Sequence, residues 1–379
     1  MPFLGRWTIQ VSFLQELTQL MKESRLQALR AVLAEKDLDA VIITKYVNLH
    51  YFSGFRGDDT TLVIGRKEAM LITDSRYTEQ AAKQAPLFEI VEQKDGLLAK
   101  TAECVQKIGA KKVGFEGNDI IYDYYAKLGE LLAGCEFKTP LKLDTLRQIK
   151  DAEEIAHIRK ACEIVDIAFA DMLTYIRPGM TEVQAAAHLE NCMRENGSEG
   201  TSFKTIMASG VRGSLPHGVA TDKVINEGEF VTLDFGAFYE GYASDITRTI
   251  CMGKADEKQR RIYKAVLESQ LLGLNKIKPG VSGRAVHEAV SDNLKKYDLA
   301  QYFGHGLGHS LGLEIHEEPR LSPKSNCEAL QPGMLVTDEP GVYIPGWGGL
   351  RIEDTVLVTE TGCEPLTKAP KELIELGAR

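Results

Sequence analysis

The sequence predicts an α/β domain followed by a larger α+β domain built from two copies of one structural unit. From about residue 22 to 140, short apolar runs alternate with amphipathic helical runs, as strands alternate with helices in an α/β domain. Asp151 and Glu154 form an Asp-x-x-Glu helix start, which places the beginning of the second domain just before them. Beyond that point two motifs recur at a spacing of about a hundred residues, and such recurrence indicates an internal duplication.

The length and composition limit the classes of protein to consider. A chain of 379 residues favours two domains of unequal size, and 44% hydrophobic with 26% charged residues is ordinary globular composition. The net charge of −9 argues against nucleic acid or an anionic membrane as partner, because both select basic surfaces. No apolar run approaches the ~20 residues of a membrane span. The seven cysteines include no C-x-x-C pair, which indicates reduced thiols and a cytoplasmic location.

The front of the chain divides into a short extension and the α/β domain proper. Residues 1–20 contain Trp7 and Phe13 but are interrupted by polar side chains, so they form no signal-peptide core, and we expect them to be an N-terminal extension. The α/β domain then spans residues 21–143. Its expected elements are a helix over Ser24–Lys36, strands over Ala40–Ile43, Thr61–Ile64 and Ala69–Ile72, a helix from Asp74 through Gln80, and two strand-and-helix units that end near Leu132. This domain contains no G-x-G-x-x-G and no P-loop pattern, so its sequence gives no indication of nucleotide binding.

The second domain, residues 144–379, carries the repeats. The repeated segments are 176–181 with 277–282, and 228–236 with 333–341. Coincidental Pro-Gly turns are the alternative explanation, but two matches in the same order favour a duplication with pseudo-twofold symmetry. Asp234 of the first copy aligns with Glu339 of the second, which predicts a site near the pseudo-axis.

A β-hairpin is expected in the first copy, with its turn at Glu240 and Gly241. If the loop has two residues, Gly236 faces Asp245, and Asp234 and Asp245 then lie diagonally on one face of the sheet. Two carboxylates at that range raise each other's pKa and cost stability unless a cation lies between them. An exposed pair of aspartates is the alternative, but the apolar run before Asp234 favours a metal site.

The second copy contributes further acidic residues and a histidine cluster. Glu339 ends an expected strand, and Glu353 lies in a run of β-forming residues where a half-buried carboxylate needs a partner charge. His305, His309 and His316 lie within twelve residues, interleaved with glycines that leave room for a ligand. A solvated glycine-rich loop is the alternative reading of these histidines.

Four carboxylates and one histidine together make an oxygen-rich set with too many carboxylates for one zinc ion. Such a set suits two divalent ions roughly 3.5 to 4 Å apart, bridged by carboxylates and a hydroxide. Hard oxygen ligands with one imidazole favour Mn2+ or Co2+. We expect Mn2+, with Co2+, Zn2+ and Fe2+ as alternatives.

Several segments of the second domain resemble, in order and spacing, the metallopeptidase family of prolidase, aminopeptidase P and methionine aminopeptidase. They are Leu233–Gly236, Ser244–Thr249, Gly308–His309 with His316–Glu317, Thr337–Gly341 and Arg351–Asp354. The resemblance implies the pita-bread fold, a pseudo-symmetric duplication that agrees with the repeats. The front domain resembles the creatinase/prolidase N-terminal domain through Asn48–Phe55 and Thr73–Tyr77. Since methionine aminopeptidases usually lack that domain, the resemblance favours the Xaa-Pro peptidases.

The resemblance also implies roles for individual residues. The implied metal ligands are Asp234, Asp245, His309, Glu339 and Glu353, with Asp245 and Glu353 shared by the two ions. His305 and His316 resemble the outer histidines that contact substrate, and His217 resembles a further active-site histidine. Many relatives have Ser-Thr where this chain has Gly306-Leu307, a small departure that concerns the pocket rather than the ligands.

These residues predict a dinuclear-metal exopeptidase that hydrolyses the Xaa-Pro bond at the N-terminus of peptides or in dipeptides, through a metal-bridging hydroxide. Glu339 is the expected proton shuttle to the leaving nitrogen, His316 is the expected donor to the oxyanion, and Arg351 is expected to orient carboxylates. By resemblance we expect a homodimer and peptide substrates with proline at the second position. The choice between dipeptidase and aminopeptidase stays open.

Three other functions fit parts of the same pattern. An aminopeptidase of other specificity would use the same site. A metal-free amidinohydrolase like creatinase resembles this architecture but lacks the full ligand set. A non-catalytic binding module on the same fold would show missing carboxylates and long charged tails, and this chain has neither.

Overall fold

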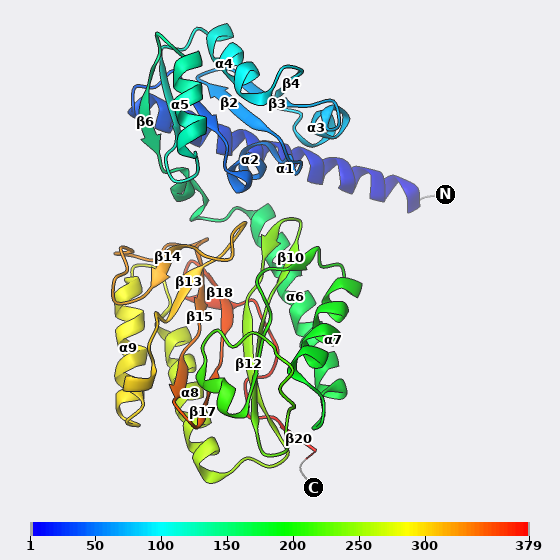
Figure 1. Ribbon diagram of the computed structural model, residues 1–379, viewed down its shortest axis with the longest axis vertical. Coiled ribbons are helices and arrows are strands. Elements are labelled where there is room, and N and C mark those ends of the chain that lie inside the picture. Colours follow the sequence, from blue (N-terminus) through cyan, green and yellow to red (C-terminus); the bar gives the residue numbers. More distant parts are fainter. Residues whose placement is uncertain (1–2, 378–379) are drawn as a thin grey trace. The chain divides into compact units, whose positions relative to one another are not determined.

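The computed structural model describes residues 3–377, and of these the side chains of residues 3–18 and of Lys138 are left out of the description. The chain divides into two compact units, residues 1–147 and residues 148–379 (Figure 1). The expected domain boundary near residue 143 falls at the start of the 3-10 helix η1 (Leu143–Arg147). Among the described residues, no helix has the length and apolar character needed to cross a membrane.

Unit 1 contains a six-stranded sheet with the order β4-β3-β2-β1-β5-β6. Strands β1, β2 and β3 are antiparallel neighbours, whereas β4, β5 and β6 pair in parallel. The strands are β1 (Ala40–Ile43), β2 (Thr61–Gly65), β3 (Ala69–Thr73), β4 (Glu89–Glu92), β5 (Lys112–Glu116) and β6 (Glu136–Leu141). The helices are α1 (Phe3–Glu35), α2 (Tyr46–Ser53), α3 (Thr78–Gln84), α4 (Leu97–Lys107) and α5 (Tyr122–Leu131). Apolar side chains of α4 and α5 form the core of the unit with the sheet.

Most of the elements expected in unit 1 are confirmed. The three expected strands coincide with β1, β2 and β3 to within one residue. The expected helix start at Asp74 is wrong. Asp74 Oδ1 accepts a hydrogen bond from Arg76 N at 2.9 Å, and this Asx turn delays the start of α3 to Thr78.

Helix α1 is longer than the helix expected at this position. It begins at Phe3 and includes most of the expected N-terminal extension. Residues 1 and 2 of that extension lie outside the described residues. The status of residues 1–20 as an extension stays a prediction.

Unit 2 repeats one order of elements. Its long helices are α6 (Ala152–Tyr175), α7 (Glu182–Glu195), α8 (Glu257–Lys276) and α9 (Gly283–Lys295). The predicted capping box at the start of α6 is confirmed, with Asp151 Oδ1 accepting from Glu154 N at 3.0 Å. Each helix pair is joined by a Pro-Gly turn whose glycine, Gly179 or Gly280, has a positive φ. Strands follow each pair, so the element order that the repeats predict is confirmed.

The strands of unit 2 lie between the helices, with α6 and α7 on one side and α9 on the other (Figure 1). Their sheets have the orders β20-β12-β9-β8, β15-β18-β19, β11-β10-β7, β13-β14 and β16-β17. The strands of the first copy are β7 (Gly200–Thr201), β8 (Ile206–Ser209), β9 (Phe230–Phe235), β10 (Ala237–Tyr239), β11 (Tyr242–Ala243) and β12 (Ile246–Met252), with the 3-10 helix η2 (Gly210–Ser214) after β8. Those that follow are β13 (Gly308–Ser310), β14 (Glu317–Leu321), β15 (Leu335–Asp338), β16 (Gly341–Ile344), β17 (Gly348–Arg351), β18 (Asp354–Val358), β19 (Cys363–Pro365) and β20 (Glu375–Leu376), preceded by η3 (Ala300–Tyr302).

Two apolar cores support the central strands. Helices α6 and α7 share one core with β9 and β12, and α8 and α9 share the other with β15 and β18. These four strands are buried along their whole length. Polar side chains on them therefore have to be paired within the protein, because bulk water cannot satisfy them.

The predicted hairpin of the first copy is confirmed. The ladder between β9 and β12 pairs Asp234 with Thr247, and the loop residues Glu240 and Gly241 have φ values of 48° and 78°. This is the register of a two-residue loop. Asp245 is therefore the diagonal neighbour of Asp234, as the sequence predicts.

The prediction of a single half-buried strand around Glu353 is wrong. The chain instead forms β17 and β18, which belong to different sheets. Glu353 lies between them, where its N–H donates to Thr247 O at 3.1 Å, and it is 2% exposed. The residues on both sides of Glu353 favour extended backbone, so β-propensity could not show where the chain changes sheets.

Candidate metal centre

Two aspartates reach the site from the first copy of the repeat. Asp234 lies on β9, and Asp245 directly precedes β12. Thr355 Oγ1 donates to Asp245 O at 2.8 Å, which fixes the backbone at that point. One oxygen of each carboxylate, Asp234 Oδ1 and Asp245 Oδ1, is buried without a hydrogen-bond partner. Because such oxygens are costly to bury, they indicate a ligand that supplies positive charge.

Two glutamates reach the site from the second copy. Glu339 directly follows β15; its N–H donates to Leu307 O at 2.9 Å, and its Oε1 accepts from Thr337 Oγ1 at 3.0 Å. Glu353 Oε2 accepts from Thr247 Oγ1 at 2.5 Å. The two threonines each hold one carboxylate oxygen and so fix the direction of the carboxylate.

His309 lies on β13, which packs closely against β15. A Cβ on the preceding Gly308 would lie 1.9 Å from Thr337 O, so this close approach requires glycine. His309 Nδ1 lies 3.0 Å from Ser310 O. Since a carbonyl oxygen only accepts, Nδ1 carries the proton in the neutral ring, and the lone pair lies on Nε2.

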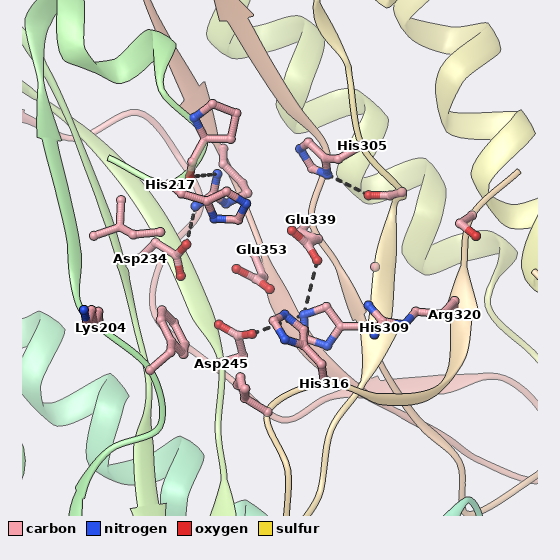
Figure 2. Close-up of a pocket in the computed structure, with 18 of the residues that line it drawn as sticks. Lys204, His217, Asp234, Asp245, His305, His309, His316, Arg320, Glu339 and Glu353 are labelled. Atoms are coloured by element: carbon pink, nitrogen blue, oxygen red, sulfur yellow. Dashed lines mark hydrogen bonds and ion pairs between the residues drawn. The ribbon is translucent and has the colours of Figure 1, made fainter. Parts of the chain in front are cut away.

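These five side chains face one point (Figure 2). His309 Nε2 lies 3.5 Å from Asp245 Oδ2 and 3.5 Å from Glu339 Oε1. One ligand atom each from Asp245, His309 and Glu353 lies within 4.8 Å of the other two. Asp234 lines the same cavity. The structure thus brings together every residue that the sequence proposes as a metal ligand.

The buried carboxylates raise one another's pKa. Burial and the negative charge of Glu353 raise the pKa of Asp245 well above its usual value. Burial and the charge of Glu339 do the same to the pKa of Glu353, and burial raises the pKa of Glu339 to about 7. Burial lowers the pKa of His309 to about 3, so the imidazole is neutral near pH 7. A neutral imidazole beside mutually repelling carboxylates is an arrangement that a metal cation stabilises.

The donor set fits divalent metal ions. Carboxylate oxygens with one imidazole nitrogen suit ions such as Mn2+ and Co2+, and a cation would satisfy the unpartnered oxygens of Asp234 and Asp245. Four carboxylates carry more negative charge than one divalent ion neutralises, so the set has the capacity for two. Thr247, Thr337 and the Ser310 carbonyl orient the donors, as outer-shell partners do in metal sites.

A cavity of about 600 Å³ adjoins the five side chains (Figure 2). His217, His305 and His316 all line it, so the four histidines that the sequence proposes for the site lie together. His316 packs edge-to-face on His309 with ring centroids 4.4 Å apart. His305 Nε2 lies 3.0 Å from Tyr343 Oη, and burial lowers the pKa of His305 to about 4.

Arg351 connects the carboxylates to the wall of the cavity. Its Nη2 pairs with Asp234 Oδ2, so the expected contact between Arg351 and a carboxylate is present. Nη1 donates to Tyr343 Oη at 2.5 Å and to Pro216 O at 3.4 Å. Pro216 directly precedes His217, so Arg351 also helps to hold the loop that carries this histidine.

Three large polar side chains of the cavity are missing from the sequence-based prediction. Lys204, Arg320 and Tyr343 line the cavity. For Arg320 a signal exists: it lies four residues after His316 in an extended segment, and alternate residues of a strand face the same side. Lys204 and Tyr343 give no such signal, because only tertiary packing brings their segments to the site.

Two family models match the chain. Residues 156–360 match metallopeptidase family M24, and residues 25–149 match the creatinase/prolidase N-terminal domain. A Xaa-Pro dipeptidase of Pyrococcus furiosus is 42% identical over 361 residues, which cover 93% of this chain and 100% of that protein.

Solved structures resemble the whole chain as well. The Xaa-Pro dipeptidase from Bacillus anthracis is 45% identical, with a TM-score of 0.91 and coverage of 94% of this chain and 100% of that chain. The X-Pro aminopeptidase from Thermotoga maritima is 36% identical, with a TM-score of 0.85 and coverage of 89% and 97%. These matches confirm the predicted fold class, an α/β creatinase/prolidase-like domain followed by an α+β pita-bread domain.

Proposed function

Because the chain belongs to metallopeptidase family M24, we propose that it hydrolyses the bond between a first residue and proline with two divalent metal ions. One observation carries this proposal. Five donor side chains meet beside a cavity, and two of their buried oxygens have no hydrogen-bond partner. The donors are Asp234, Asp245, His309, Glu339 and Glu353. They would hold the two ions, which when bound make water nucleophilic near neutral pH and polarise the substrate carbonyl.

Glu339 is our candidate for proton transfer to the leaving nitrogen. A general acid or base must lie within reach of the reacting atoms, and Glu339 lines the cavity with its Oε1 3.5 Å from His309 Nε2. Thr337 donates to Oε1 of this carboxylate. The other oxygen, Oε2, is then the one that we propose takes and releases the proton.

The surrounding residues bind and orient the substrate. His316 lines the cavity beside His309, and we assign it the hydrogen bond to the carbonyl oxygen as negative charge develops there. His217 and His305 contact the substrate from the same cavity. Arg351 holds the Asp234 carboxylate in its orientation.

The cavity suits a small peptide that ends in proline. Phe203, Ile206, Pro216 and Val219 line it with apolar surface, which can receive a pyrrolidine ring. Arg320 lines the same cavity, and its guanidinium can pair with the free carboxylate of a dipeptide. We therefore propose that a dipeptide such as Ala-Pro is preferred over longer peptides.

Hydrolysis of Ala-Pro, Ala-Pro-Ala and Ala-Ala by the full chain tests this function. The protein is stripped with a chelator and assayed with and without added Mn2+. We expect manganese-dependent cleavage of Ala-Pro, slower cleavage of Ala-Pro-Ala and none of Ala-Ala. Faster cleavage of the tripeptide would make the protein an aminopeptidase. Turnover by the stripped protein would contradict the metal role, and failure of the loaded protein on both proline substrates would contradict the specificity.

Replacing Arg320 tests the carboxylate contact by itself. Loss of a charge-assisted hydrogen bond in Arg320→Met lowers kcat/KM for Ala-Pro roughly 10- to 100-fold. The amide of Ala-Pro lacks the negative charge, so its kcat/KM is expected to change little. Arg284→Met on α9 is a matched control, since Arg284 is exposed and does not line the cavity. Equal losses for the acid and the amide would show that Arg320 does not bind the carboxylate.

Three finer features belong to the same proposal. Mn2+ is the proposed ion because carboxylate oxygens dominate the donor set. A cytoplasmic location is supported by the seven cysteines, all of which are free. The proposal that the protein forms a homodimer rests on the family resemblance. Metal analysis, cell fractionation and size-exclusion chromatography check the three features in turn.

A further inference from the structure

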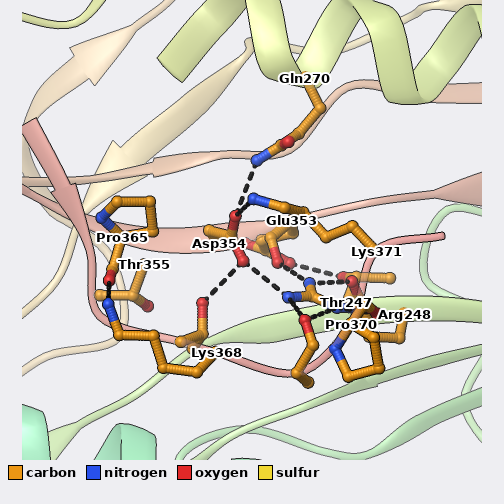
Figure 3. A network of polar contacts seen from close by, with 12 residues as sticks. Thr247, Arg248, Gln270, Glu353, Asp354, Thr355, Pro365, Lys368, Pro370 and Lys371 are labelled. Atoms are coloured by element: carbon orange, nitrogen blue, oxygen red, sulfur yellow. Dashed lines mark hydrogen bonds and ion pairs between the residues drawn. The ribbon is translucent and has the colours of Figure 1, made fainter. Parts of the chain in front are cut away.

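A second buried polar network lies next to Glu353 and includes its backbone carbonyl (Figure 3). Arg248 on β12 is 1% exposed and Asp354 on β18 is fully buried, and Arg248 Nη2 donates to Asp354 Oδ1 at 2.7 Å. Neither side chain lines the cavity of the candidate site. A buried ion pair is expensive unless its remaining donors and acceptors are also satisfied, so the other contacts of these two residues indicate what they hold together.

Arg248 joins the backbone of Glu353 to the C-terminal segment 367–371. Its Nη1 donates to the carbonyl oxygen of Glu353. Its Nε donates to Ala369 O and Pro370 O, both at 3.1 Å, and Nη2 donates to Ala369 O at 2.7 Å. The planar guanidinium reaches all these acceptors at once, which a lysine ammonium cannot do.

Asp354 holds the same C-terminal segment from the other side of the pair. Its Oδ1 accepts from Thr367 Oγ1 at 2.9 Å. Its Oδ2 accepts from Lys371 Nζ at 2.6 Å and from Gln270 Nε2 at 2.9 Å. The carboxylate of Asp354 is therefore fixed by donors from β12, from α8 and from both ends of the segment.

The network is coupled to the candidate site through adjacent residues. Thr247 precedes Arg248 on β12, and Glu353 precedes Asp354 at the start of β18. Neighbours in an extended chain point to opposite faces. Thr247 Oγ1 donates to Glu353 Oε2 at 2.5 Å, while Arg248 and Asp354 meet on the other face. A shift of the pair would therefore move the Glu353 carboxylate.

We propose that Arg248 and Asp354, fastened by segment 367–371, are positioning residues that fix the Glu353 carboxylate for metal binding. The inference rests on the proposed function, in which Glu353 is a ligand of both ions. Outer-shell partners of metal ligands commonly control metal affinity. Loosening this network should therefore weaken metal binding more than the loss of a partly exposed ion pair elsewhere in unit 2.

Arg248→Lys in the full-length chain is the test. The substitution keeps the positive charge but replaces the planar guanidinium, which reaches several acceptors at once, by an ammonium group. Mn2+ binding to the chelator-treated protein is measured by isothermal titration calorimetry, and Arg248→Lys is expected to weaken the apparent Kd about 10-fold or more. Glu375→Gln is the control, because it breaks an arginine–carboxylate pair that is partly exposed rather than buried. Glu375 Oε1 pairs with Arg260 Nη2 at 2.6 Å near the C-terminus and makes none of the contacts described above. Its loss should change the Kd less than about threefold.

Lys371→Met keeps the inference testable if Arg248→Lys fails to fold. The Lys371 side chain is 21% exposed, and its truncation leaves Arg248 and Asp354 in place. We expect a Kd about three- to tenfold weaker than that of the wild type, in a protein that still melts cooperatively. A merely structural role would lower the melting temperature and leave the Kd unchanged.

The outcomes separate this inference from the proposed function. Wild-type Mn2+ affinity in folded Arg248→Lys, or in Lys371→Met where only that variant folds, would overturn the inference and leave the proposed function standing. A wild-type chain that binds no Mn2+ would overturn the proposed function instead.

Discussion

Replacing Glu339 by glutamine tests whether the candidate site is a cluster of like charges that needs cations. In the metal-free protein, burial raises the pKa of Glu339 from 4.5 to about 7. Because the pKa is higher in the folded state, the folded carboxyl group keeps its proton to a higher pH than the unfolded one. Its contribution to stability is complete below about pH 4.5 and is lost as the pH rises through about 7. Above that pH the ionised carboxylate lowers the free energy of unfolding by about 3 kcal/mol.

Glutamine keeps the size of this side chain and its oxygen acceptor for Thr337 but carries no charge. Metal-free Glu339→Gln is therefore expected to be more stable than the metal-free wild type by about 3 kcal/mol at pH 8.5 and by less than about 1 kcal/mol at pH 4.5. For a domain of this size the difference at pH 8.5 corresponds to roughly 6–12 °C in melting temperature.

Differential scanning calorimetry of the chelator-treated proteins at the two pH values measures this difference. Glu360→Gln is the matched control, because Glu360 is exposed and its change should shift the melting temperature by no more than about 1–2 °C. Saturating Mn2+ should reverse the order, since the wild type has the full ligand set and gains more from binding. A metal-free Glu339→Gln that is no more stable than the wild type at pH 8.5 would refute the reasoning.

Three further predictions follow from the same geometry. The apparent affinity for Mn2+ should rise from pH 6 to pH 8, because a proton competes with the metal for Glu339, whose pKa is about 7; equal calorimetric affinities at the two pH values would contradict this. Thr247→Val removes the hydroxyl that donates to Glu353 Oε2 and should lower the free energy of unfolding by about 1–3 kcal/mol in urea, whereas unchanged stability would argue against this contact. Gly308→Ala places a Cβ 1.9 Å from a carbonyl oxygen of β15 and should abolish Mn2+ binding. Gly304→Ala is the control and should bind Mn2+ normally, because a Cβ at Gly304 meets open space. Normal Mn2+ binding by Gly308→Ala would disprove the close packing of β13 against β15.

Features governed by local rules could be predicted from the sequence. The two-residue hairpin loop sets the register that makes Asp234 and Asp245 diagonal neighbours, and turn chemistry fixes that register within a few residues. The capping box at Asp151 is equally local. The duplicated motifs then place Glu339 at the position equivalent to Asp234 without any knowledge of tertiary contacts.

Features governed by tertiary contacts could not be predicted in this way. Glu353 lies where the chain passes from one sheet to another, and both flanks have the same extended preference. The contacts of Arg248 with segment 367–371 join residues about 120 positions apart, for which no periodicity exists. The surroundings of Asp338 could not be predicted either. Both its carboxylate oxygens are buried without a hydrogen-bond partner, although the rest of its strand has the composition of an ordinary core strand.

The claim that the five-residue cluster holds the ions required for hydrolysis has one most direct test. The rate of Ala-Pro hydrolysis by the chelator-stripped full chain is followed as Mn2+ is added, and the bound metal is measured at each point. We expect no turnover without metal, a rate that rises with bound metal and saturates at about two ions per chain, and no such rise in Asp245→Asn. Turnover by the metal-free wild type, or a wild-type titration curve from Asp245→Asn, would contradict the claim.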